Sequence, residues 1–326
     1  MKIDFVITWV DSTDPKWLAK KDQYANVKSN YSDSKTAERF RDYGTLRYLL
    51  RSIEKYAPWV NHVFLVTDNQ RPEWLRDTSK LTVIDHTDFL KPDDLPVFNS
   101  NAIELSLDKI PGLAEHFVYF NDDVLLNKPV KPADFFDDNG APRDTRIYFS
   151  LRPKEDFDSI QFTNLKLINR DVIKGQWPLT KKGLFNRGYG RNNLHNSLQL
   201  LRKWVTGYYN PHSAFSFTKS DFQQARELWA QEFAQTSTHR FRKQNEISLW
   251  LICYLRMELG QFAPRALTFS QYYTITDGDR IQSDLQAADH KVLCINDTET
   301  DNYVADITKL NQALAEKFPT KSIFER

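Results

Sequence analysis

The chain has 326 residues, with 44 Lys and Arg against 43 Asp and Glu, and hydrophobic residues make up 40% of it. The balanced charge excludes a protein dedicated to nucleic acid, and the apolar content excludes a disordered chain. The ten glycines form no GxGxxG or GxxxxGK[ST] loop, and the two cysteines are too few for a disulfide framework, which favours a reducing cytoplasm. No apolar run reaches 18 residues, so any association with a membrane would be peripheral.

Predicted strands and helices alternate over the first 130 residues. Continuous apolar runs predict the strands, at 3–10, 62–67, 81–84 and 116–120. A stripe through Leu46, Leu49 and Ile53 predicts a helix within 36–57, and a second helix is expected at 99–108. This alternation favours an α/β fold with a Rossmann-like, mostly parallel sheet, which binds its ligand where the strands end.

The remaining sequence divides into two parts. Residues 131–205 are predicted to be an irregular insertion with one strand at 146–151, and residues 206–326 a helix-rich part. Apolar spacing predicts the later elements, namely helices at 194–205, 222–234, 246–259 and 304–314 and a strand at 291–295.

Two adjacent carboxylates, Asp122 and Asp123, follow the strand at 116–120. Two acids at a strand end repel each other unless a cation is present, and Mg²⁺ or Mn²⁺ prefers carboxylate oxygens. The pair therefore predicts a divalent metal site. The alternative is an Asx-rich turn with no metal.

The first strand ends in Thr8, Trp9 and Val10, where an indole and short polar groups could hold a base and a ribose. The alternative is that Trp9 packs in the core, as most tryptophans within apolar runs do. Glu104 lies in the helix at 99–108 and would project a carboxylate toward the strand ends, or else be a solvated surface residue.

Candidate residues also lie in the second half. His212 occupies a turn, and Arg240 and Arg242 precede a predicted helix. A guanidinium matches phosphate oxygens and an imidazole relays protons near neutral pH, so these residue types suit phosphoryl transfer. Surface charge and turn capping are the alternatives. Asp297 follows the strand at 291–295 and would close the metal site or form an ordinary turn.

Taken together, these segments resemble the Stealth family of polysaccharide phosphotransferases. The blocks that carry the resemblance are 3–15, then 39–60 continuing to 121–124, then 211–246, and finally 294–298 with Phe318 and Pro319. The resemblance leaves out about 130–205. It implies a nucleotide-sugar transferase-like fold in which 1–130 binds the nucleotide sugar, 131–205 contributes acceptor specificity and 206–326 completes the site.

The resemblance implies transfer of a sugar-1-phosphate from a UDP-sugar to a hydroxyl of a glycan or lipid-linked oligosaccharide, with release of UMP and formation of a phosphodiester. By position, the residues that correspond to the family's catalytic residues are Glu104, Asp123, His212 and Arg242. The divalent cation, Mg²⁺ or Mn²⁺, would be held by Asp122, Asp123 and Asp297. The expected UDP contacts are Thr8, Trp9, Val10 and Arg47, although Arg47 could instead pair with Glu54.

The roles within this set stay open at the level of sequence. Asp123 or Glu104 would take the hydroxyl proton, and Arg242 and the metal would stabilise the phosphoryl oxygens. His212 would protonate UMP, orient the acceptor or act as a nucleophile. Two rival functions are a metal-dependent glycosyltransferase that releases UDP and a catalytically inactive glycan-binding module.

One position departs from the animal relatives, in which an acidic pair follows the third-block arginine. Here Asn245 replaces the first acid, and Glu246 is retained. The animal enzymes' extra domains and membrane anchors have no counterpart, which predicts a compact bacterial enzyme of capsule or exopolysaccharide synthesis at the cytoplasmic face of the membrane. The sequence does not indicate an oligomeric state.

Overall fold

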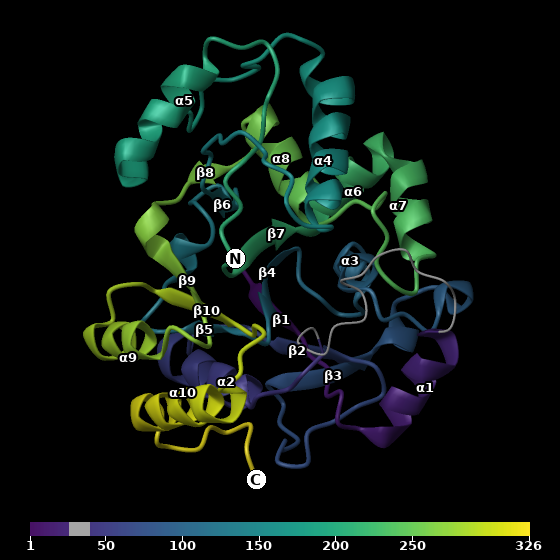
Figure 1. Cartoon of the computed structure of the whole chain (residues 1–326), viewed down its shortest axis with the longest axis vertical. Coiled ribbons are helices and arrows are strands. Elements are labelled where there is room, and N and C mark those ends of the chain that lie inside the picture. Colours follow the sequence, from purple (N-terminus) through teal and green to yellow (C-terminus); the bar gives the residue numbers. More distant parts are fainter. Residues whose placement is uncertain (26–39) are drawn as a thin grey trace.

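The computed structural model describes residues 1–25 and 40–326, and within these ranges a five-stranded sheet forms the centre of the fold (Figure 1). Its strand order is β3 (Leu81–Asp85), β2 (Val63–Thr67), β1 (Ile3–Thr8), β4 (His116–Asn121) and β7 (Phe215–Thr218). The first four strands are parallel and β7 is antiparallel to β4. The predicted mostly parallel α/β sheet is therefore confirmed, with β7 as an addition that the sequence did not reveal.

A second sheet continues from the polar end of the first. It has the order β5 (Val124–Leu126), β10 (Val292–Asn296) and β9 (Ser270–Thr274). Only Asp122 and Asp123 separate β4 from β5. Because β10 pairs with β5 and β7 pairs with β4, strands from 206–326 join both sheets. The division at 130 and 205 stays a prediction. A short pair, β6 (Arg143–Asp144) and β8 (Ala263–Pro264), lies farther along the chain.

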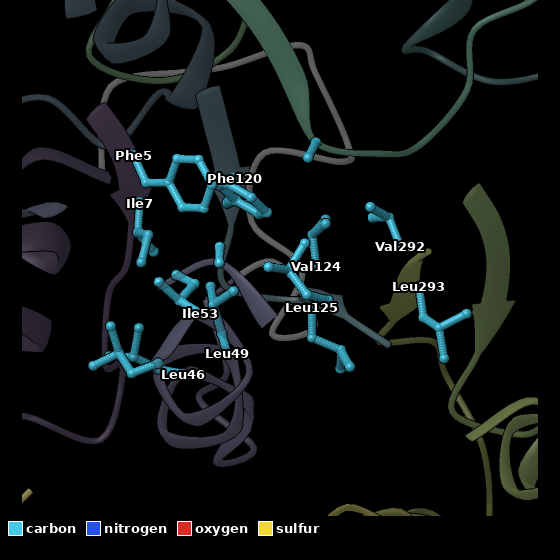
Figure 2. Close-up of a cluster of buried hydrophobic side chains, with 14 of the residues drawn as sticks. Phe5, Ile7, Leu46, Leu49, Ile53, Phe120, Val124, Leu125, Val292 and Leu293 are labelled. Carbon is cyan, nitrogen blue, oxygen red and sulfur yellow. The ribbon is translucent and has the colours of Figure 1, made fainter. Parts of the chain in front are cut away.

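Helix α2 (Thr45–Tyr56) covers one face of the central sheet because its leucines and isoleucine recur every three or four residues. Figure 2 shows Leu46, Leu49 and Ile53 of α2 directed toward Phe5 and Phe120 of the sheet, all five of which are buried. The predicted helix is confirmed from Thr45 onward, whereas residues 36–39 lie outside the described ranges.

The other helices surround the sheets and form most of the second half (Figure 1). They are α1 (Pro15–Ala25), α3 (Ser100–Glu104), α4 (Asp158–Leu167), α5 (Asn193–Gln199), α6 (Lys219–Leu228), α7 (Ala230–Ser237), α8 (Trp250–Leu259), α9 (Gly278–Ala287) and α10 (Tyr303–Lys317). None of those within the described ranges is long and apolar enough to cross a bilayer. The sequence missed α1, α4, α9 and β9.

Two sequence predictions for the second half are wrong. The helix expected at 222–234 is two helices, because buried Trp229 leaves helical geometry and donates its indole N–H to Asp171 at 2.7 Å. The segment expected to be a strand at 146–151 forms no named strand and only an isolated antiparallel bridge, between Tyr148 and Tyr208. Its backbone bonds are shared between that neighbouring segment and the side chain of Asn196, which binds Arg146 and Tyr148. With α4 and α5 present, 131–205 is also less irregular than predicted.

Candidate active site at the carboxyl ends of the strands

The central polar contacts lie where β1 and β4 end side by side, with Thr8 in register with Asn121. The hydroxyl groups of Thr8 and Tyr119 are 2.9 Å apart. The Tyr119 hydroxyl is also 2.5 Å from Oδ1 of Asn121 and 3.2 Å from Oε1 of Glu104. These contacts place Glu104, which ends α3, over the carboxyl edge of the sheet, as the sequence predicted for its carboxylate.

Glu104 is joined to Arg242 through one hydroxyl group. Ser100 lies one helical turn before Glu104 and hydrogen-bonds to its carboxylate, and Arg242 donates from Nη2 to Oγ of Ser100 at 2.5 Å. Burial raises the pKa of Glu104 to about 7, although the bonds from Tyr119 and Ser100 oppose that rise. The result is a carboxyl group that exchanges its proton near neutral pH, close to a permanent positive charge.

Glu246 fixes the position of the Arg242 segment against α3. Its buried carboxylate accepts hydrogen bonds from the side-chain amides of Asn99 and Asn101, at 2.8 and 3.1 Å, and from the backbone of Lys243, at 2.7 Å. The ring of His239 lies 3.0 Å from the same carboxylate. The acid that this chain retains therefore holds two distant segments together, whereas Asn245 is exposed.

Asp122 and Asp123 occupy the turn between β4 and β5. The Asp123 carbonyl accepts from the backbone of Ile295 at 2.9 Å, and Oδ2 of Asp123 accepts from the Cys294 thiol at 3.5 Å. Its Oδ1 is buried and has no hydrogen-bond partner among the described residues. Burial raises the pKa of Asp123 to about 6, and burial together with the charge of Asp123 raises the pKa of Asp122 well above its usual value.

Asp297 lies near this pair but is engaged differently from the prediction. Its Oδ2 forms an ion pair with Nε of Arg41 at 2.7 Å, and that guanidinium lies 4.1 Å from the centre of the Tyr303 ring. Within 1–25 and 40–326, no three His, Cys, Asp or Glu side chains are grouped as ligands of one ion. The metal set of Asp122, Asp123 and Asp297 is thus not preassembled, and it stays a prediction.

His212 packs against β9, the strand next to β10, whose Cys294 contacts this carboxylate pair. Its exposed ring packs against Tyr272 at 4.8 Å between ring centres, and Tyr272 pairs in register with Cys294, which contacts Asp123. Protein atoms around the imidazole lower the pKa of His212. The side chain is therefore neutral near pH 7 and connects to Asp123 only through intervening residues.

The expected UDP contacts fall into two groups. Thr8 and Val10 are half-buried at the end of β1, and Trp9 is buried in the core cluster beneath it. Arg47 does not pair with Glu54; its Nε lies 3.7 Å from Glu325, and its guanidinium lies 5.0 Å from the Trp74 ring centre.

Arg240 donates to the carbonyl of Leu95 at 3.1 Å, a contact that ties its segment to the loop before α3.

Sequence reasoning missed several side chains that build the site. Ser100 and Tyr119 both contact Glu104, and Cys294, a buried thiol, contacts Asp123. A signal was available for Ser100, because it lies four residues before Glu104 and so on the same face of a helix. Tyr119 was visible as a polar tip within an apolar strand.

Comparison with known families agrees with this arrangement of segments. Three conserved regions of the Stealth proteins match the chain: conserved region 1 at residues 1–26, conserved region 2 at 39–144 and conserved region 3 at 211–255. Region 1 ends beyond β1, region 2 contains α3 and the Asp122–Asp123 turn, and region 3 contains His212, Arg242 and Glu246.

Three curated relatives match this chain over nearly their whole length. The exopolysaccharide phosphotransferase cps2G of Lactiplantibacillus plantarum is 42% identical, over 99% of this chain and 96% of its own. A capsular polysaccharide phosphotransferase WcwK of Streptococcus pneumoniae is 37% identical, over 100% and 98%. The receptor polysaccharide phosphotransferase WefC of Streptococcus oralis is 32% identical, over 99% of each chain. The solved galactosyltransferase LgtC is similar at 12% identity over 98% of each chain, with a TM-score of 0.44.

The α/β sheet with an acidic carboxyl edge and the full-length relatives define an enzyme of the phosphotransferase class. Within that class, the chain belongs to the Stealth family.

Proposed function

We propose that this enzyme transfers a sugar-1-phosphate from a UDP-sugar to a hydroxyl of an acceptor glycan, with release of UMP, in bacterial capsule or exopolysaccharide synthesis. The names of the full-length relatives support a polysaccharide as the product. The structural observation that carries the proposal is the Glu104–Ser100–Arg242 chain beside the paired carboxylates. A UDP-sugar donor implies that the reaction takes place in the cytoplasm, at the inner face of the membrane when the acceptor is lipid-linked.

Glu104 is the general base in this proposal. A base works best when its pKa lies near the working pH, and the pKa of Glu104 is about 7. The acceptor hydroxyl gives its proton to Glu104 while its oxygen bonds to the β-phosphorus of the donor. The bond from that phosphorus to the oxygen bridging to UMP breaks, and UMP leaves with the electron pair. Direct transfer of this kind inverts the configuration at phosphorus.

Arg242 stabilises the transferring phosphoryl group. A guanidinium carries five N–H groups, of which the bond to Ser100 uses one. The Glu246 clamp holds the segment of Arg242 against α3, so the charge needs little reorganisation during the reaction.

Asp122 and Asp123 would hold the divalent cation. Their carboxylates fit Mg²⁺ or Mn²⁺, because Oδ1 of Asp123 is buried without a hydrogen-bond partner among the described residues and the charge of Asp123 raises the cost of ionising Asp122. A bound cation supplies charge neutralisation on the diphosphate. Thr8, Val10 and Arg47 are proposed to contact UDP. Asp297, which forms an ion pair with Arg41, is proposed to lie beside the metal.

His212 and Tyr272 are proposed to orient the acceptor sugar. Both residues are exposed and their rings lie against each other, so they offer an aromatic and hydrogen-bonding surface of the kind that sugars bind. This role leaves Glu104 as the proton acceptor.

The test is a donor screen that identifies the nucleotide released. The full chain is incubated with Mg²⁺ or Mn²⁺, a panel of UDP-sugars and glycan from a producing strain, and UMP and UDP are separated chromatographically. We expect UMP, dependent on metal and acceptor. Asp123→Asn should lower the rate about 10³-fold, with donor binding retained, whereas the exposed control Asp289→Asn should leave it unchanged. Release of UDP would overturn the proposal in favour of a glycosyltransferase.

A further inference from the structure

The apolar side of helix α5 faces solvent and its polar side faces the protein, the opposite of an ordinary surface helix. Leu194, Leu198 and Leu201 recur at helical spacing and are 65%, 51% and 84% exposed. The buried positions between them are amides: Asn196 and Gln199. The sequence predicted a helix at 194–205 from this leucine spacing, and the structure shows that the leucines face solvent.

The buried amides explain why the leucines point outward. Asn196 donates to the carbonyls of Arg146 and Leu184, at 2.8 and 2.5 Å, and accepts from the backbone of Tyr148 at 3.0 Å. Gln199 donates to the carbonyl of Trp204 at 2.6 Å. Rotating the helix to bury its leucines would break these bonds, so the exposed stripe is a fixed property of the fold.

Neighbouring segments extend the apolar stripe. We define the α5 surface as Phe185, Leu194, Leu198, Leu200, Leu201 and Trp204, all of which are exposed. The Trp204 ring lies over Gly175, where a Cβ would come within 3.2 Å of it, and Trp177 donates its backbone N–H to Lys203 at 3.3 Å. Figure 1 shows α5 near the end of the molecule opposite the C-terminus, away from the central sheet.

Positive charge surrounds the α5 surface without any negative charge in the same stretch. The sequence has no Asp or Glu between 172 and 220, although 43 acids in 326 residues would place about six there on average. The exposed cations next to the surface are Lys181, Lys182, Arg187, Arg191, Arg202 and Lys203. Among the described residues, none of them has an ion-pair partner.

We propose that the α5 surface docks the enzyme on an anionic lipid bilayer, with the leucines and Trp204 inserted at the headgroup boundary and the six cations over the lipid phosphates. A short amphipathic segment with Leu and Trp on one face and Lys and Arg beside it binds in the interface plane by this combination of apolar burial and charge attraction.

Charge complementarity favours a bilayer over a second copy of the chain. Two copies that met through this surface would bring like charges together, and exposed like charges oppose association. An anionic membrane satisfies both the apolar stripe and the unpaired cations.

The test is flotation of the full chain with vesicles of phosphatidylglycerol and phosphatidylcholine, compared with vesicles of phosphatidylcholine alone. We expect the protein to float with the anionic vesicles and to dissociate as salt is raised. The triple variant Leu194→Ser, Leu198→Ser, Leu201→Ser should reduce the bound fraction about tenfold, as should Arg202→Gln with Lys203→Gln. Because all five side chains are exposed, these changes should leave the unfolding midpoint unaltered.

Val304→Ser with Leu228→Ser is the matched control, since both residues are exposed and lie on α10 and α6. This variant should float like the wild type. Equal binding to neutral vesicles, or binding that the α5 variants do not change, would overturn the proposal. So would a concentration-dependent dimer, measured by light scattering, that the triple variant abolishes. The readout is lipid binding alone, so it succeeds or fails independently of the donor screen.

Discussion

Two regions of this molecule hold carboxylates away from open solvent, one fully buried and one half-buried, and only the first pairs its carboxylate with a positive charge. On α8, Glu258 accepts from Arg146 at 2.9 Å, from the hydroxyls of Tyr148 and Tyr208 at 2.7 and 3.0 Å, and from the indole of Trp177 at 3.1 Å. At the carboxyl ends of the strands, by contrast, Glu104, Asp122 and Asp123 form no ion pair with a described residue, and the pKa of each is raised.

The difference separates a structural cluster from a reactive one. A fully paired carboxylate can neither bind a cation nor take up a proton without breaking the fold. A carboxylate buried without a positive partner destabilises the protein while it is charged, and such groups gather where a ligand supplies the missing charge. Mutations should therefore affect stability in the first region and catalysis in the second.

The largest effect on stability is expected from Glu258→Gln. The change leaves the guanidinium of Arg146 buried beside a neutral amide, so the free energy of unfolding should fall by about 3–5 kcal/mol. Urea denaturation measures this loss, and the rate per folded molecule should stay near that of the wild type.

The control for this prediction is Asp279→Asn, which breaks the exposed 2.5 Å pair with Lys309 and should leave the denaturation midpoint unchanged. If Glu258→Gln were as stable as the wild type but inactive, the paired cluster around Glu258 would have a catalytic role. The two regions would then not divide into a structural and a reactive one.

The strands were predictable because their sequences carry their own signal. β1, β2 and β10 are continuous apolar runs, buried along nearly their whole length, and each ends in polar residues. The acidic pair could be placed for the same reason, since residues that follow a parallel strand lie at the carboxyl edge. β7 could not be predicted, because its four residues become a strand only by pairing antiparallel with β4.

Long-range contacts account for the parts of the site that were missed. Ser100 and Arg242 are 142 residues apart, and they meet because Glu246 binds the amides of Asn99 and Asn101. The outward direction of α5 has the same kind of cause, since it depends on backbone groups of Arg146 and Leu184 that no local pattern reveals. Sequence periodicity identified the stripe but not the side to which it faces.

Glu104→Gln is expected to have smaller effects, which differ in sign: it should lower the rate but raise the stability at alkaline pH. Its rate should fall about 10²-fold, because the glutamine cannot accept the acceptor's proton. The pKa of Glu104 is about 7 in the folded protein and about 4.3 in an unfolded chain. The stabilising effect of its protonated form is therefore complete below pH 4.3 and is lost as the pH rises through 7, so the variant should exceed the wild type in stability at pH 8 by up to about 3 kcal/mol.

Thermal unfolding of both proteins at pH 5 and pH 8 checks that sign. The stability difference should be small at pH 5 and favour the variant at pH 8. A variant that is less stable than the wild type at pH 8 would mean that Glu104 is satisfied when charged, like Glu258, and the two regions would no longer differ.

The smallest effect, about tenfold on the rate at pH 7, is expected from Ser100→Ala. Two consequences combine, because Arg242 loses its anchor and Glu104 loses a hydrogen bond that lowers its pKa. The pKa of Glu104 should rise further, so the acid limb of the pH–rate profile should move to higher pH and part of the lost rate should return at alkaline pH. Ser283→Ala, at an exposed position on α9, should leave the profile unchanged. A rate loss of equal size at every pH would show that Ser100 positions Arg242 without tuning Glu104, and the carboxyl group would then owe its ionisation to burial and Tyr119 alone.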